Sequence, residues 1–204
     1  VCEYIFCPEN LIVSVTSERK VLEKFGEQLK VLQSCLKTAK ADLKIEKTDL
    51  CKKNEGFLTS SQVQYVAVAG NFKKAGLTYT GALRVLKTIL SYDYLWLQIR
   101  VKGGAYGCMS GFTRTGNGYF ASYRDPNLKA TFDVYGGTVD YLKNFAASDR
   151  DMLKYIIGTI SDMDIPLTPS MAGQRSFTAY LTGVTEERIL KEREEVLSCT
   201  AADI

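Results

Sequence analysis

The chain has 204 residues, of which 46% are hydrophobic and 24% charged, a composition typical of globular proteins with a large buried core and not of disordered chains. Its 26 basic and 23 acidic residues give a net charge of +3 and are spread along the sequence, so nucleic-acid binding is not indicated. No apolar run approaches the roughly 20 residues that cross a bilayer, and residues 1–16 lack the pattern of a signal peptide, so we expect a soluble protein past any targeting segment.

The sequence contains six cysteines and no histidine. The cysteines lack the close pairs of zinc ligands and the density of a disulfide-rich domain, which predicts free thiols in a reducing compartment. A metal site built from four distant cysteines remains an alternative. Cys108 lies beside a glycine-rich segment and could act as a nucleophile, but the chain has no imidazole that would deprotonate it.

The first third predicts a strand, a helix and a second strand. Residues 11–16 are rich in β-branched side chains and predict a strand, after which Ser17 is expected to cap a helix over residues 18–37. That helix has an apolar residue at every third or fourth position: Val21, Phe25, Leu29, Leu32 and Leu36. We expect residues 38–60 to form a surface connection and residues 63–69 to form a central strand.

A long helix, a hairpin and a third helix are expected next. Apolar side chains recur at helical spacing over residues 78–100, with a bend expected near residues 91–93. Residues 105–115 and 119–124 flank Gly116-Asn117-Gly118 and predict a β-hairpin, because these turn residues adopt positive φ at little cost.

The next helix is expected to begin at a proline. Asp125 and Pro126 fit the N-cap and first position of a helix that continues through two glycines to residue 142.

The C-terminal third predicts a run of capped helices. Ser148 with Asp151 resembles a capping box for a helix through residue 160, and a helix over residues 171–181 is expected to end at Gly183. Thr185 is expected to cap a last helix over residues 186–199. The charged face of this last helix is expected to be solvated: Glu187, Lys191, Glu194 and Glu195.

The order of these elements predicts an α+β fold, with a mixed or antiparallel sheet covered by helices on one face. We expect residues 1–204 to form a single domain. Residues 200–204 resemble the start of a further helix, and both ends are abrupt, so we expect the domain to be part of a longer polypeptide.

One segment places a permanent cation and a phenol six positions apart around two glycines: Arg100-Val101-Lys102-Gly103-Gly104-Ala105-Tyr106-Gly107. Taken singly, these residues have structural explanations, since arginine often ends a helix, glycines often turn the chain and tyrosine often opens a strand. A phosphate-binding loop fits less well, because the Lys-Ser/Thr step of a P-loop is missing and a strand follows. Taken together, they favour a chain that binds and polarises a substrate while another part supplies the attacking group.

The surrounding residues carry a family resemblance. The stretch Tyr-Leu-Trp-Leu-Gln-Ile-Arg-Val-Lys-Gly-Gly-Ala-Tyr-Gly at residues 94–107, followed by Ser-Tyr-Arg-Asp-Pro-Asn at residues 122–127, resembles the C-terminal domain of presequence proteases. These enzymes are a branch of the pitrilysin and insulinase zinc metallopeptidases. The resemblance extends from about residue 11 to the C-terminus. It implies a domain similar to those of pitrilysin and the mitochondrial processing peptidase, the last of four in an endopeptidase that degrades unstructured peptides.

The resemblance also implies roles for individual residues. Arg100 would bind the substrate, Tyr106 would stabilise the developing oxyanion, and Gly103 and Gly104 would let the backbone approach the peptide. Three further residues could face the substrate chamber but are equally well explained by packing or turns: Asn71, Tyr119 and Tyr123. Zinc would be bound by the absent N-terminal domain through an inverted His-x-x-Glu-His motif, and by no residue of this chain.

The implied partners are the N-terminal half of the same polypeptide and extended peptide substrates, with no nucleic acid and no membrane. The fragment alone is expected to be inactive, and the parent enzyme to work in a bacterial cytoplasm or an organelle matrix. The alternative is a noncatalytic structural or peptide-binding domain of a relative that has lost hydrolysis.

Overall fold

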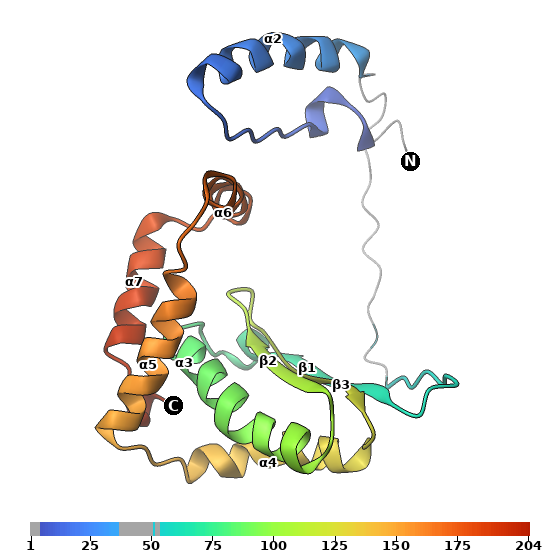
Figure 1. The fold of residues 1–204 in the computed structure, drawn as a ribbon, viewed down its shortest axis with the longest axis vertical. Helices are drawn as coiled ribbons and strands as arrows, with labels where there is room; N and C mark the ends of the chain where they lie inside the picture. The colour runs from blue at the N-terminus through green and yellow to red at the C-terminus, as the bar shows by residue number, and fades with distance from the viewer. Residues whose placement is uncertain (1–4, 37–50, 52–53) are drawn as a thin grey trace. The chain divides into compact units, whose positions relative to one another are not determined.

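The computed structural model describes residues 5–36, 51 and 54–204. They group into two compact units, a smaller one of Val1–Phe57 with Pro166–Val184 and a larger one of Leu58–Ile165 with Thr185–Ile204 (Figure 1). The expectation of a single domain over residues 1–204 stays a prediction.

The larger unit contains a three-stranded antiparallel sheet in the order β1-β3-β2, formed by β1 (Gln64–Asn71), β2 (Gly107–Phe112) and β3 (Asn117–Asp125). The predicted strand at residues 63–69 and the predicted hairpin are confirmed, but the turn is formed by residues 113–116 rather than 116–118, because β3 already begins at Asn117. The prediction that the first of these strands is central is wrong, because β3 lies between β1 and β2. β1 is therefore an edge strand of the described sheet, and its side chains Tyr65 and Val68 are exposed.

Helices cover one face of this sheet, as predicted (Figure 1). The helix predicted over residues 78–100 begins as α3 (Ala82–Ile89) and continues to residue 102 as two π-helical segments, η3 (Leu90–Tyr94) and η4 (Trp96–Lys102). The first π-helical segment contains the residues at which a bend was expected. π-Helical turns are uncommon and occur frequently at functional sites.

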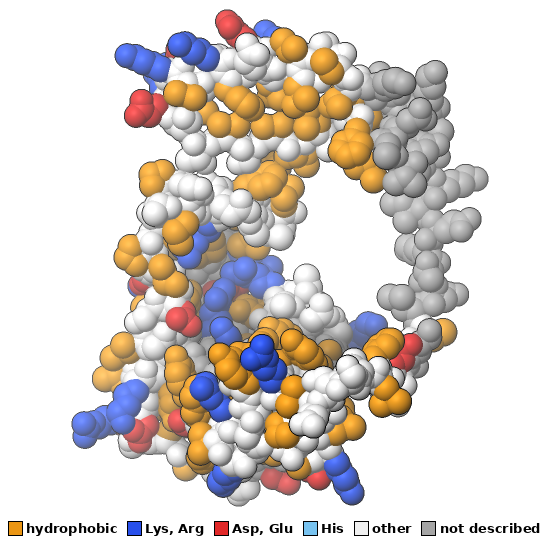
Figure 2. Space-filling model, turned by 45° about the vertical axis from the view of Figure 1, so that its right-hand side comes forward, with side chains coloured by type: hydrophobic (Ala, Val, Ile, Leu, Met, Phe, Trp, Pro, Cys, Tyr) orange, Lys and Arg blue, Asp and Glu red, His pale blue; other side chains and the backbone are white. Residues whose placement is uncertain are grey.

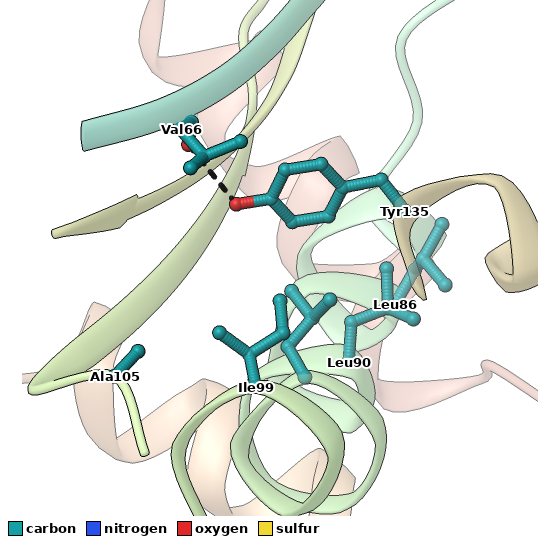
Figure 3. Packing of buried hydrophobic residues seen from close by; sticks show 7 residues of the cluster. Val66, Leu86, Leu90, Ile99, Ala105 and Tyr135 are labelled. Carbon is teal, nitrogen blue, oxygen red and sulfur yellow. Dashed lines mark hydrogen bonds between the residues drawn. The ribbon is translucent and has the colours of Figure 1, made fainter. Parts of the chain in front are cut away.

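The core of the larger unit lies between the sheet and these helices. Val66 of β1, Leu90 of η3 and Ile99 of η4 are almost completely buried in it. Tyr135 of α4 (Lys129–Lys143) packs in the same cluster and donates a hydrogen bond from its hydroxyl to the Val66 carbonyl oxygen at 3.1 Å (Figure 3). This bond satisfies a polar group that would otherwise be costly to bury.

Helix α4 continues through Gly136-Gly137, as predicted, but the prediction of its start is wrong. Asp125 is not its N-cap. Instead, β3 extends to Asp125, and α4 begins at Lys129 after Leu128. The carboxylate of Asp125 is fully buried and accepts hydrogen bonds from the hydroxyls of Ser122 and Thr131, so it is engaged within the core rather than at a helix end.

Two further helices of the larger unit pack against α3: α5 (Asp149–Met163) and α7 (Glu186–Leu197). Their predicted caps are confirmed, since the Ser148 hydroxyl accepts from the Asp151 N–H and the Thr185 hydroxyl accepts from the Arg188 N–H. A second apolar cluster joins them: Val85, Ile89, Met152, Val196 and Cys199. The predicted terminal helix start is a 3-10 turn, Ala201–Asp203.

The smaller unit contains α2 (Arg19–Cys35) and α6 (Pro169–Thr182). Both predicted helices are confirmed, and Gly183 ends α6 in the left-handed conformation with φ 64°. The predicted strand at residues 11–16 is wrong, because β-branched residues form a strand only where a partner strand supplies the hydrogen bonds, and no strand is present among the described residues of this unit. Glu18 rather than Ser17 occupies the N-cap of α2. Most of the expected connection at residues 38–60 lies outside the described residues.

Candidate functional site

A sharp turn after η4 sets the direction of the chain between Arg100 and Tyr106. Gly104 adopts the left-handed conformation with φ 79°. Its N–H donates to the Arg100 carbonyl oxygen at 3.0 Å, and the Ala105 N–H donates to the Ile99 carbonyl oxygen at 3.1 Å. Any other L-residue at Gly104 would be strained by about 1 kcal/mol or more. These two hydrogen bonds therefore end the π-helical segment η4, and the chain continues through the turn into β2.

The neighbouring Gly103 is required for a different reason. A Cβ atom at this position would lie 2.6 Å from the Ile99 carbonyl oxygen, and a backbone atom cannot move aside as a side chain can. We expect Gly103→Ala to lower the free energy of unfolding by about 1–3 kcal/mol, measured by urea denaturation.

Gly136→Ala is the matched control. This glycine lies in α4, where an added Cβ meets no atom within 4 Å, so alanine should stabilise the chain by about 0.5–1 kcal/mol through its higher helix propensity. Equal effects of the two substitutions would contradict the steric role of Gly103.

Arg100 lies near the end of η4 and is exposed. Its guanidinium carbon is 4.0 Å from the centre of the Trp96 ring, four residues earlier on the same face of the segment. A cation held over an indole face in this way is attracted by the ring and restricted in its motion. The structure thus presents Arg100 as an oriented, solvent-facing cation.

Tyr106 lies immediately before β2, and 58% of its surface is exposed. Its ring is 5.5 Å from that of Tyr123, and the Arg124 guanidinium carbon is 5.3 Å from the centre of the Tyr106 ring. The Tyr106 N–H also donates to the Arg124 carbonyl oxygen at 3.3 Å. In the described part of the chain, no hydrogen bond engages the Tyr106 hydroxyl or joins it to Arg100, so both side chains are open to a ligand.

Arg124 was not predicted as a site residue, although its backbone is unusual. Its φ of 47° is the one positive value at a non-glycine residue in the described chain. Such a conformation persists only where the surrounding structure enforces it, and strained residues of this kind cluster at functional sites.

The sheet face opposite the helices is open and aromatic. Tyr123 lies over Gly107 on the neighbouring strand, and Tyr119 lies over Gly111 in the same way, so that a Cβ at either glycine would strike the ring. Tyr65 stacks on Tyr123 with 6.5 Å between ring centres. Together with Tyr106, these rings form the aromatic face: Tyr65, Tyr106, Tyr119 and Tyr123. Figure 2 shows exposed hydrophobic side chains beside Lys and Arg on one side of the larger unit.

Two other candidates from the sequence have structural explanations. Asn71, the last residue of β1, donates from its side-chain amide to the Asn117 side chain at 2.8 Å, so it links β1 to the start of β3. Burial raises the pKa of the Cys108 thiol, and the nearby charge of Arg100 only partly offsets it, so this cysteine stays protonated and is a poor nucleophile.

The residues that the structure describes do not form a zinc site. Across residues 5–36, 51 and 54–204, no three His, Cys, Asp or Glu side chains gather as metal ligands, and the sequence has no histidine. Free thiols are found at Cys35, Cys51, Cys108 and Cys199. Among the same residues, no helix has the length and apolar character of a membrane span.

An apolar hollow of about 440 Å³ lies at the opposite end of the sheet from Tyr106, lined by residues that include Val68, Phe112 and Tyr119. It is separate from the turn between Arg100 and Tyr106, because β2 runs from Gly107 near that turn to Phe112 at the hollow.

A buried carboxylate on α7 was missed by sequence reasoning. Glu192 is 4% exposed and accepts two hydrogen bonds from Arg114, from Nε at 2.6 Å and from a terminal nitrogen at 2.7 Å. Arg84 and Arg188 each approach it at 3.3 Å. Burial raises the pKa of Glu192, but the hydrogen bonds and charges of Arg114 and Arg84 outweigh burial and hold it below its ordinary value.

The Glu192 cluster joins the β2–β3 turn, which carries Arg114, to α3 and α7. The expectation of a solvated face on α7 holds for Glu187, Lys191 and Glu194, which are exposed. It is wrong for Glu195, which is partly buried because its carboxylate accepts the Gly81 N–H at 2.6 Å.

Comparison with known proteins identifies relatives. Residues 54–204 match the family model described as the PreP C-terminal domain. Protein HypA of Clostridium perfringens is 44% identical over 204 residues, which cover 99% of this chain and 21% of that protein. Presequence protease 1, chloroplastic/mitochondrial, of Arabidopsis thaliana is 39% identical over 152 residues, which cover 74% of this chain and 14% of that protein. The chain thus spans about a fifth or less of the length of these relatives.

Two crystal structures have a similar fold. A peptidase M16 inactive domain from Pseudomonas fluorescens aligns with a TM-score of 0.57 at 17% identity, over 92% of this chain and 46% of that one. A candidate zinc protease from Bordetella pertussis Tohama I aligns with a TM-score of 0.54 at 16% identity, over 68% of this chain and 82% of that one. At these identities the likeness shows the fold alone.

Proposed function

Because the chain belongs to the presequence protease (PreP) C-terminal domain family of the pitrilysin-type peptidases, we propose that it completes the active site of a zinc-dependent endopeptidase. The N-terminal half of the same polypeptide holds the metal and the attacking water, and this chain supplies Arg100 and Tyr106. The observation that carries the proposal is that these two side chains are exposed on either side of the Gly104 turn.

The chemistry of the two side chains suits different tasks. Arg100 stays protonated at any physiological pH and offers forked N–H donors to a substrate carbonyl oxygen. Tyr106 offers a single O–H donor, which can stabilise the oxygen that becomes negative as the peptide bond is attacked. Arg100 therefore binds the peptide in the ground state, and Tyr106 acts mainly in the transition state.

The substrate is an extended, unstructured peptide. The aromatic face includes Tyr106, and its members Tyr119 and Tyr123 lie over glycines of the neighbouring strand, so their rings can contact many different side chains of a peptide. Gly103 and Gly104 let the backbone approach the peptide closely. A folded protein cannot present an isolated segment to such a surface and is a poor substrate.

A noncatalytic structural or peptide-binding domain is the second candidate function. It is favoured by the similarity to the inactive domain from Pseudomonas fluorescens, although that similarity concerns the fold alone. The exposure of Arg100 and Tyr106 on either side of one turn favours the catalytic proposal, because it leaves a cation and a hydroxyl donor available to a ligand.

The free thiols of Cys35, Cys51, Cys108 and Cys199 suit a reducing compartment, such as a bacterial cytoplasm or an organelle matrix. The alternative settings are both represented among relatives, since one is bacterial and others are named chloroplastic or mitochondrial.

Complementation tests the proposal. The purified chain should be inactive alone and should restore peptide cleavage when mixed with the N-terminal half of the parent polypeptide. Chains that carry Tyr106→Phe or Arg100→Ala should bind that half equally well, measured by size-exclusion chromatography, but should fail to restore cleavage. Full rescue by both variants would contradict the assignment of these residues.

A further inference from the structure

Residues 124–127, at the end of β3 and just after it, form hydrogen bonds with the turn between Arg100 and Tyr106. The side-chain amide of Asn127 donates to the Gly103 carbonyl oxygen at 2.5 Å. This carbonyl lies at the C-terminal end of η4, where the last carbonyl groups of a helix have no partner within it. Asn127 thus supplies, from 24 residues away in the sequence, the hydrogen bond that the end of the helix lacks.

Asn127 is itself held in place by Asp125. One carboxylate oxygen of Asp125 accepts the Asn127 N–H at 2.9 Å, and the other accepts the hydroxyls of Ser122 at 2.5 Å and Thr131 at 2.8 Å. Pro126, between them, has a fixed φ and lies against Gly104, 3.8 Å from where a Cβ would be. With three donors on a fully buried carboxylate, the position of Asn127 is well determined.

The other end of the turn is held by the same segment. The Arg124 carbonyl oxygen accepts the Tyr106 N–H, and the Arg124 guanidinium lies over the Tyr106 ring. The left-handed backbone of Arg124 redirects the chain between these contacts and the buried Asp125. Residues 124–127 therefore form hydrogen bonds with both ends of the turn, at Gly103 and at Tyr106.

We propose that Asn127, oriented by Asp125, is a positioning residue that fixes the angle of the Gly103–Gly104 turn and thereby the distance between the Arg100 guanidinium and the Tyr106 hydroxyl. This inference rests on the proposed function of those two residues. In this arrangement the segment at residues 94–107 carries the groups that meet the substrate, and the segment at residues 122–127 sets their spacing.

The test is Asn127→Ala in the full-length parent polypeptide. Alanine retains the backbone N–H that Asp125 binds and removes only the side-chain amide. Since a misplacement of about 1 Å can cost about 100-fold in rate, kcat should fall about 10- to 100-fold, with KM changed far less. The matched control is Asn144→Ala, which removes a bond of the same kind, from a side-chain amide to the Asp140 carbonyl oxygen at 2.8 Å, and should leave kcat unchanged.

A double-mutant cycle separates positioning from a general structural role. If Asn127 acts through Tyr106, Asn127→Ala should have little further effect on kcat in a Tyr106→Phe background. A full-sized additional loss in that background would overturn the inference. An unchanged kcat for Asn127→Ala, together with a lowered kcat for Tyr106→Phe, would overturn this inference alone, whereas an unchanged kcat for Tyr106→Phe would overturn the proposed function as well.

A second variant covers the case in which the alanine protein does not fold. Asn127→Leu keeps the side-chain volume without the amide donor. A folded leucine variant with lowered kcat supports the role of the hydrogen bond, whereas a leucine variant with full activity shows that Asn127 only fills space. Unfolding of both variants would likewise overturn the inference, because Asn127 would then be required for the fold itself.

Discussion

Tyr106→Phe in the full-length polypeptide is expected to lower kcat about 100- to 1,000-fold and to leave KM nearly unchanged. Phenylalanine keeps the ring that packs against Tyr123 and Arg124, so the turn should keep its shape. It removes only the hydroxyl, which would meet its acceptor as charge develops in the transition state. The measurement is steady-state cleavage of an unstructured fluorogenic peptide.

Tyr92→Phe is the matched control, because Tyr92 is 72% exposed and lies in η3, outside the candidate site. It should retain full activity. A rise in KM with an unchanged kcat for Tyr106→Phe would show that Tyr106 contributes only to substrate binding, and an unchanged kcat and KM would exclude it from the site.

Glu192→Gln is expected to have the largest effect on stability, lowering the free energy of unfolding of the chain by about 3 kcal/mol at neutral pH. Removing one member of a buried charge cluster leaves the remaining charges without compensation, which typically costs about 3–5 kcal/mol. The lower end applies because the arginine side chains around Glu192 are about a third exposed. Urea denaturation of the chain measures the difference.

The effect of Glu192→Gln should also depend on pH. Because the folded protein holds the pKa of Glu192 below its ordinary value of 4.5, the folded state favours the ionised form, and the cluster stabilises the protein above about pH 4.5. This stabilisation is lost as the pH falls through the pKa of the folded state. The difference between Glu192→Gln and the native chain should therefore shrink below pH 4.5.

The matched control on the same helix is Glu194→Gln, which alters an exposed carboxylate and should change stability by less than about 0.5 kcal/mol. A Glu192→Gln effect as small as this, or one that does not change between pH 7 and pH 3, would contradict the role of the buried cluster.

Local signals predicted much of the larger unit. Gly116 indicated the hairpin because its turn requires a positive φ, although Asn117 and Gly118 belong to β3 rather than to the turn. Ser148 and Thr185 marked helix starts because their hydroxyls satisfy N–H groups a few residues away. The resemblance of residues 94–107 directed attention to Arg100 and Tyr106, which the structure places in the open.

Features that depend on distant partners could not be predicted in this way. Residues 11–16 have the composition of a strand, but a strand also needs a neighbour to pair with. Asp125 before a proline resembles an N-cap, yet its buried carboxylate accepts hydrogen bonds from the hydroxyls of Ser122 on β3 and Thr131 on α4. Glu192 looked like one more charge on a polar helix, because only the folded chain brings Arg84 and Arg114 to it.

The most direct measurement is the affinity of the full-length enzyme and its Tyr106→Phe variant for a phosphinic peptide that mimics the tetrahedral transition state. If the Tyr106 hydroxyl stabilises the oxyanion, the inhibition constant should rise by the same factor by which kcat/KM falls, because both report transition-state binding. An inhibition constant that stays the same while kcat/KM falls would contradict a transition-state role for Tyr106.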